Sequence, residues 1–72
     1  MSGRPVKRSL TLHGHRTSVS LEEAFWAEFR RLAATDGLAL NRLAERIDET
    51  RGEVGLASAI RVYVLQQALG ER

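Results

Sequence analysis

The sequence predicts a mainly α-helical fold with a short β-ribbon near the amino terminus. Apolar and polar residues alternate from Ser9 to Leu21, and three later segments carry apolar residues at helical spacing. A chain of 72 residues forms a single domain with a modest core. It contains no cysteine, so disulfides and thiolate metal sites cannot stabilise it.

The alternation in the ribbon segment changes parity at Gly14. Before this glycine, Leu10 and Leu12 share one face. After it, one face carries Thr17, Val19 and Leu21, and the other carries Arg16, Ser18 and Ser20. A single straight strand cannot bury both apolar sets, so we expect either a short hairpin or a bent strand at this point.

Three helices are expected after the ribbon. The first runs from about Leu21 to Thr35, with Ser20 and Glu23 as a capping box and Gly37 as a left-handed cap after its end. The second covers residues 40–51, with apolar residues at positions 40, 43, 44 and 47.

The third helix, residues 56–69, is apolar around most of its circumference. Two short helices of one small chain cannot cover so much apolar surface, so this helix predicts a homodimer. The residues expected in the dimer core are Val19, Leu21, Phe25, Ile60 and Val64.

Positive charge is concentrated at the amino end. Residues 1–20 contain no Asp or Glu, whereas the rest of the chain contains all nine acidic residues. We therefore expect a flexible basic arm at residues 1–7, followed by a folded domain at residues 8–70. In or beside this arm, Arg4, Lys7 and Arg8 could face an anionic partner or could serve only to keep the arm soluble, and charge alone does not favour either interpretation.

Enzymatic and metal-binding alternatives are weaker. His13 and His15 share a strand face, but the first twenty residues supply no Cys, Asp or Glu to complete a metal site. Neither Ser18 nor Ser20 lies in a Gly-x-Ser-x-Gly turn, and the chain is too short to enclose a substrate pocket. We expect no enzyme activity, no metal and no cofactor.

A dimer would give the ribbon a function. Two copies of the strand after Gly14 could pair across a two-fold axis, with Arg16, Ser18 and Ser20 projecting outward. A two-stranded ribbon fits the major groove of DNA, where Arg reads guanine and Ser forms hydrogen bonds with several bases. Arg4, Lys7 and Arg8, in or beside the arm, are then expected to contact DNA phosphates. No apolar run approaches the ~20 residues of a membrane span, so we expect a cytoplasmic protein with no membrane partner.

The segment RTSVSLEEAFWAEFRRLAATDGLALNRLAERIDETRGEVGLASAIRVYVLQQAL resembles the ribbon-helix-helix proteins of the Arc and MetJ type. The resemblance covers about residues 8–69. It is most similar to a small bacterial branch whose pattern stands here as Gly14 to Glu22, ahead of Phe25 and Trp26. It implies an intertwined homodimer with an intermolecular ribbon that binds DNA in the major groove.

Carried over by position, the resemblance assigns base contacts to Arg16, Ser18 and Ser20. It also implies a phosphate contact at the amino end of the second helix, at Ala39, Leu40 and Asn41. The chain departs from the simple pattern in having a third helix, and in having Ala39 where a Ser or Thr cap is typical.

The function expected from the sequence is a dimeric transcriptional regulator on double-stranded DNA, associated with the nucleoid. Two alternatives remain open. One is the antitoxin of a toxin–antitoxin pair. The other is a dimeric interaction or nucleotide-sensing module without DNA binding, whose effector the sequence does not name.

Overall fold

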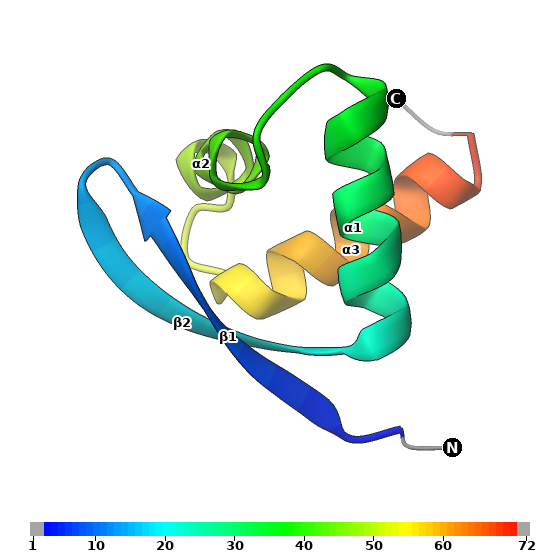
Figure 1. The fold of residues 1–72 in the computed structure, drawn as a ribbon, viewed down its shortest axis with the longest axis horizontal. Helices are drawn as coiled ribbons and strands as arrows, with labels where there is room; N and C mark the ends of the chain where they lie inside the picture. Colours follow the sequence, from blue (N-terminus) through cyan, green and yellow to red (C-terminus); the bar gives the residue numbers. More distant parts are fainter. Residues whose placement is uncertain (1–2, 71–72) are drawn as a thin grey trace.

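The amino-terminal third of the chain is a β-hairpin. A computed structural model of the protein describes residues 3–70. Strand β1 (Pro5–Leu12) pairs antiparallel with β2 (His15–Glu22) (Figure 1). His13 and Gly14 form the turn with φ of 52° and 81°, as in a type I′ turn, which suits the twist of the two strands. Of the two expected arrangements, the hairpin is therefore the one adopted.

The pairing register explains the change of parity at the turn. Leu10 lies opposite Thr17, and Val6 lies opposite Leu21. Residues directly opposite each other in an antiparallel pair project on the same face. The apolar residues of both strands thus share the inner face of the hairpin, where Leu10, Leu12, Val19 and Leu21 are buried.

Three helices follow, as the sequence predicted: α1 (Glu23–Thr35), α2 (Leu40–Thr50) and α3 (Leu56–Ala68). The predicted capping box is wrong, because Ser20 lies inside β2 and Glu22 takes the N-cap position without a side-chain cap bond. The ladder continues to the Pro5–Glu22 pair, which holds Ser20 in extended conformation opposite Lys7.

The predicted left-handed cap at Gly37 is confirmed. Gly37 has a φ of 68°. Its amide donates to the Ala34 carbonyl at 3.0 Å, and the Leu38 amide donates to the Ala33 carbonyl at 2.8 Å. These two bonds are the Schellman pattern, which turns the chain out of α1 and toward α2.

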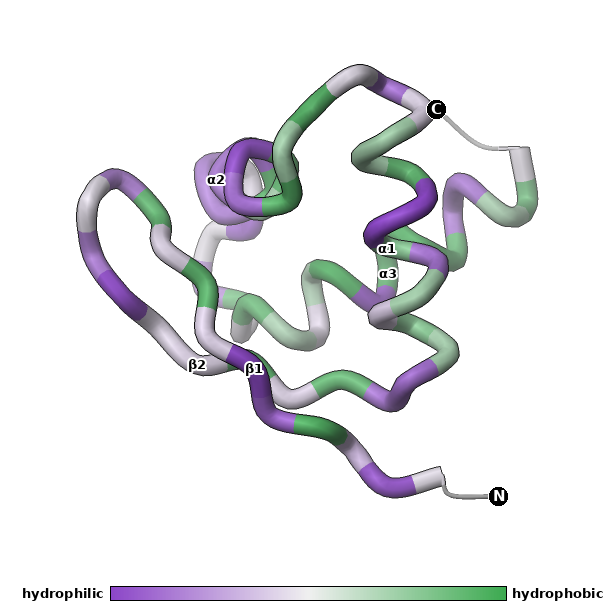
Figure 2. Tube along the Cα trace, viewed as in Figure 1, coloured by the Kyte–Doolittle hydropathy of each residue, from purple (hydrophilic) through white to green (hydrophobic). Residues whose placement is uncertain are grey.

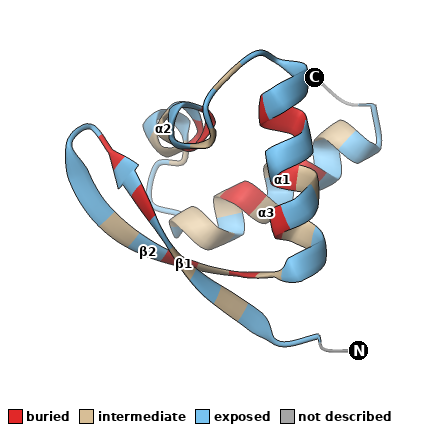
Figure 3. Ribbon diagram, viewed as in Figure 1, coloured by how far each residue is buried: buried red, intermediate tan, exposed pale blue. Residues whose placement is uncertain are grey.

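The core lies between the inner face of the hairpin and the three helices (Figures 2 and 3). Its largest fully buried side chains are Trp26, Phe29, Leu21, Leu43 and Ile60. Of the residues expected in a dimer core, Val19, Leu21, Ile60 and Val64 lie in this intrachain core, with Phe25 packed against it. No helix within residues 3–70 is both long and apolar enough to cross a membrane.

The structure places Pro5 to Lys7 in β1, inside the segment expected to be an arm. Val6 is held there because it packs opposite Leu21 and its carbonyl accepts a 2.8 Å hydrogen bond from Trp26 Nε1. The ribbon therefore begins earlier than residue 8. Residues 1–2 of the expected arm lie outside the described residues.

Candidate nucleic-acid interface

The outer face of the hairpin carries cations and hydroxyls. Of the four directly opposite pairs with this parity, the one next to α1 is Pro5 with Glu22, whose carboxylate accepts hydrogen bonds from Arg61. The other three are Lys7 with Ser20, Ser9 with Ser18, and Thr11 with Arg16. We call these six residues the outer face. None of them is a carboxylate, so the face presents positive charge and hydroxyl hydrogen-bonding groups together.

The outer face includes all three residues predicted to contact bases. Arg16 and Ser18 are exposed, and Ser20 is half-buried near the start of α1. The structure adds Ser9 and Thr11, which sequence reasoning did not assign to the site. Their alternation with Leu10 and Leu12 predicts that they lie on the opposite face of the strand from these leucines. Only the register shows that they lie beside Ser18 and Arg16.

The expected phosphate-contacting cations divide between two faces. Lys7 is exposed on the outer face, and Arg4 is exposed just before β1. Arg8 is different, because it projects inward and is half-buried. Its Nη2 lies 3.0 Å from Glu23 Oε1, and its guanidinium carbon lies 5.6 Å from the centre of the Trp26 ring. Through these two contacts, Arg8 stabilises the packing of β1 against α1.

The amino end of α2 lies beside the outer face. Asn41 Oδ1 accepts a hydrogen bond from the Thr11 amide at 3.2 Å. Since Thr11 is opposite Arg16, the expected phosphate segment of Ala39, Leu40 and Asn41 is near one expected base contact. Ala39 is the N-cap of α2 and forms no side-chain cap bond, as its methyl side chain requires.

The tip of the hairpin is attached to α2. Glu45 Oε2 accepts a 2.8 Å hydrogen bond from the His13 amide, and His13 Nε2 lies 3.7 Å from Glu49 Oε2. The bond from the His13 amide is the main cause that lowers the pKa of Glu45. Among residues 3–70, no group of three or more His, Cys, Asp and Glu side chains could hold a metal ion.

Arg61 of α3 fixes the other end of β2. Its Nε donates to Glu22 Oε1 at 2.9 Å, and its Nη2 donates to the Ser20 carbonyl at 3.2 Å. The hydrogen bond from Arg61 is the main cause that lowers the pKa of Glu22. Sequence reasoning missed Arg61 because it acts across 39 positions of the chain, where no local pattern signals a contact.

A family model described as a ribbon-helix-helix domain matches residues 5–68. The chain belongs to this ribbon-helix-helix family. The family is one of DNA-binding regulators and antitoxins. The match begins at Pro5, where β1 also begins, so it includes the whole hairpin.

One solved structure resembles this ribbon-helix-helix domain closely. It is that of an uncharacterized protein from Bordetella pertussis Tohama I, with 38% sequence identity and a TM-score of 0.80. The match covers 94% of this chain and 58% of that protein, so the present chain spans a little over half of its length. No curated protein matches the sequence significantly.

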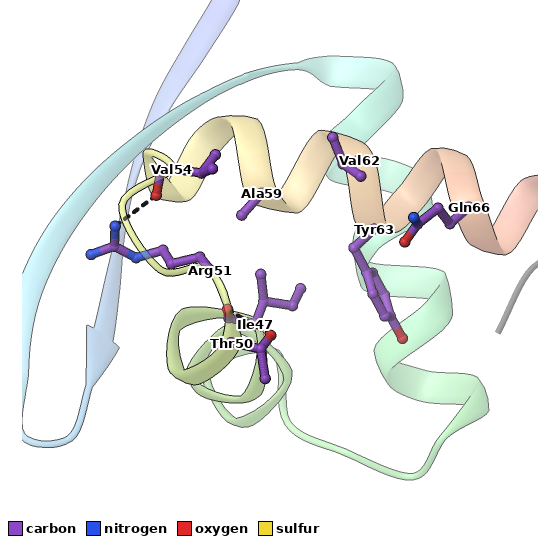
Figure 4. A pocket seen from close by; sticks show the side chains of 8 residues that line it. All are labelled: Ile47, Thr50, Arg51, Val54, Ala59, Val62, Tyr63 and Gln66. Atoms are coloured by element: carbon purple, nitrogen blue, oxygen red, sulfur yellow. Dashed lines mark hydrogen bonds between the residues drawn. The ribbon is translucent and has the colours of Figure 1, made fainter.

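A second surface of the domain is apolar. A groove of about 280 Å³ lies between α2 and α3, lined in part by Ile47, Val54 and Tyr63 (Figure 4). On the exposed side of α3, Val62 and Leu65 are 51% and 55% exposed, and Leu69 at the C-cap of this helix is 64% exposed. The spacing of three and four residues places these three side chains in one stripe. We call them the α3 stripe.

Proposed function

We propose that this domain is a homodimeric transcriptional regulator that binds specific DNA sequences through the outer face of its hairpin. The observation that carries the proposal is the composition of that face, which joins two cations to four hydroxyls, while the one carboxylate with the same parity, Glu22, lies at the α1 end and is paired with Arg61. Phosphate attraction requires the cations, and base edges in the major groove accept hydrogen bonds from arginine and serine. The family membership supports the same function.

The dimer is expected to form by pairing β2 with β2 of a second copy. This would give a four-stranded sheet with the two β2 strands at its centre. Strands lie about 4.8 Å apart, so the two β1 strands would be roughly 14 Å apart, wider than the ~12 Å major groove. We therefore assign base contacts to Arg16, Ser18 and Ser20 at the centre, and a phosphate contact to Lys7 on the flanking strand.

The α3 stripe supports a second copy independently of the ribbon. Arg61 is the one charged residue of α3 and forms an ion pair with Glu22. The exposed side of this helix therefore has no other charged side chain to make it hydrophilic. No cofactor is needed for a function that rests on surface contacts. Bound to DNA, the protein would lie on the nucleoid in the cytoplasm.

Affinity for a preferred and a scrambled DNA duplex, measured over a series of salt concentrations, tests the proposal. The preferred duplex would first be selected from random DNA with the parent protein. Arg16→Ala and Ser18→Ala should each weaken binding to the preferred duplex by about 1–3 kcal/mol and reduce the discrimination between duplexes. Lys7→Ala should weaken binding to both duplexes alike and flatten the salt dependence by about one unit for each phosphate that is no longer neutralised.

The chain offers matched controls for these substitutions. Arg30→Ala removes an exposed arginine from α1, and Ser58→Ala removes an exposed serine hydroxyl from α3, both away from the outer face. Neither control should change affinity as its counterpart does. If Arg16→Ala and Ser18→Ala remain folded and bind both duplexes like the parent, the outer face does not read DNA. A binding module without DNA recognition would then be the better interpretation.

A further inference from the structure

The direction of the backbone groups follows from one hydrogen bond. The Thr11 amide donates to Asn41 and so points away from β2. Directly opposite residues in an antiparallel ladder alternate between pairs that hydrogen-bond each other's backbone and pairs that do not. Because the Thr11 amide points away from β2, Thr11 and Arg16 are a pair without such hydrogen bonds. By the period of two, the outward edge of β1 carries the backbone of Lys7, Ser9 and Thr11. The outward edge of β2 carries that of Arg16, Ser18 and Ser20.

The outward edge of β1 is obstructed at both ends. Asn41 accepts a hydrogen bond from the Thr11 amide, and Glu45 accepts one from the His13 amide at the turn. At the other end, Pro5 has no amide hydrogen to offer and Lys7 places a charge on the edge. A proline, a lysine and a covering helix are three ways in which proteins prevent an edge strand from pairing.

The outward edge of β2 is open by comparison. Within residues 3–70, the side chain that bonds its backbone is Arg61, at the Ser20 carbonyl next to α1. No side chain of the described residues bonds the backbone of Arg16 or Ser18. Figure 1 shows the same asymmetry near the turn, where β1 lies between α2 and β2.

We propose that Asn41 and Glu45 of α2, with Pro5 and Lys7, close the β1 edge, so that strand pairing through β2 ends with a second copy of this chain and cannot continue. A chain with two open edges can add further chains without limit, whereas a chain with one open edge pairs about a two-fold axis and closes. This inference rests on the dimer of the proposed function and adds what limits its size.

Hydrogen exchange of the unmodified protein is the first test. The Arg16 and Ser18 amides should be protected at high protein concentration and lose that protection on dilution. The Thr11 and His13 amides should be protected at both concentrations, since side chains of the same chain bond them. The Ser9 amide should exchange rapidly at both. Concentration-dependent protection of Ser9, like that of Ser18, would mean that β1 also pairs and would overturn the inference.

A variant with an opened edge is the second test. Asn41→Ala, Glu45→Ala and Lys7→Thr together should convert a dimer of twice the 8.0 kDa chain mass into species whose mass grows with concentration. Adding Ser18→Pro to this variant should stop that growth, because proline removes an outward amide that the hairpin does not use. Arg30→Thr with Arg46→Ala changes two exposed side chains that form no hydrogen bond to either strand within residues 3–70, and should leave the dimer unchanged.

The outcomes separate the two proposals. A parent protein that stays monomeric at all concentrations contradicts the dimer of the proposed function. A parent dimer whose opened variant also remains a dimer contradicts the closed edge alone. If the opened variant does not fold, the Ser9 amide of the unmodified protein decides the matter.

Discussion

At the scale of single residues, Glu45 provides a prediction about pH. The bond from the His13 amide lowers the pKa of Glu45 below its ordinary value of 4.5, so this bond stabilises the fold where the carboxylate is ionised. The contribution is fully present above the unfolded pKa and is lost as pH falls through the folded pKa. Stability measured by denaturant unfolding should therefore decline in acid more steeply for the parent than for Glu45→Gln.

The glutamine variant is a matched control, because its amide oxygen can accept the His13 bond at every pH. Glu22 and Glu28 also have lowered pKa values, owing to Arg61 and Arg31, and they remain in both proteins. The difference between the two curves therefore isolates Glu45. An NMR titration in which the Glu45 carboxyl shows its ordinary pKa would contradict the assignment.

The positions of the outer-face residues could be predicted from the sequence, but the contacts that hold them could not. The parity of Arg16, Ser18 and Ser20 was enough to place them on one face, because a strand has a fixed period. The role of Arg61 could not be predicted, since its partners are distant in sequence. Arg8 is a cation like Lys7 but projects to the opposite face, a difference that composition does not show.

At the scale of secondary-structure elements, helical periodicity and glycine position were sufficient to predict all three helices. The start of α1 was misplaced because a Ser-x-x-Glu pattern also fits a strand that ends against a helix. Tertiary pairing decided between them, since Ser20 lies opposite Lys7 and Glu22 opposite Pro5. The ladder bonds of the hairpin thus outweigh one local capping interaction.

Gly37 provides the prediction at this scale. Its φ of 68° is strained for a residue with a side chain, although a Cβ placed there would meet no atom within 4 Å. Gly37→Ala should therefore cost about 1–2 kcal/mol from backbone conformation alone. For a domain of this size, that corresponds to a melting temperature lower by roughly 4–8 °C per kcal/mol.

Gly37→Asn is the control, because asparagine tolerates the left-handed conformation better than alanine does. It should lose less stability than Gly37→Ala. Equal losses for the two variants in a thermal melt would show that the left-handed conformation is not the source of the cost.

At the scale of the whole molecule, the sequence indicated a partner from the apolar character of the third helix. The structure changes which residues support that idea. Ile60 and Val64 are used within the chain, whereas Val62, Leu65 and Leu69 are left exposed. Sequence periodicity could not divide these residues, because α3 is apolar on nearly every side and only the packing of α1, α2 and the hairpin decides which side is covered.

The dimer predicts that thermal stability depends on protein concentration. Association stabilises the folded chains by mass action, so the unfolding midpoint of the parent should rise over a hundredfold increase in concentration.

The variant Leu65→Ser tests whether the α3 stripe is part of the dimer interface. In a monomer, a substitution at a residue that is 55% exposed should change stability by no more than about 0.5 kcal/mol. In a dimer that covers the stripe, the loss should be larger and should occur in both copies, with a lower midpoint and a weaker association constant. Arg30→Ala, on the exposed surface of α1, should leave both quantities unchanged. Calorimetry and sedimentation on the three proteins make the comparison. A concentration-independent midpoint with a monomer mass would exclude the dimer, and a dimer unaffected by Leu65→Ser would place its interface away from α3.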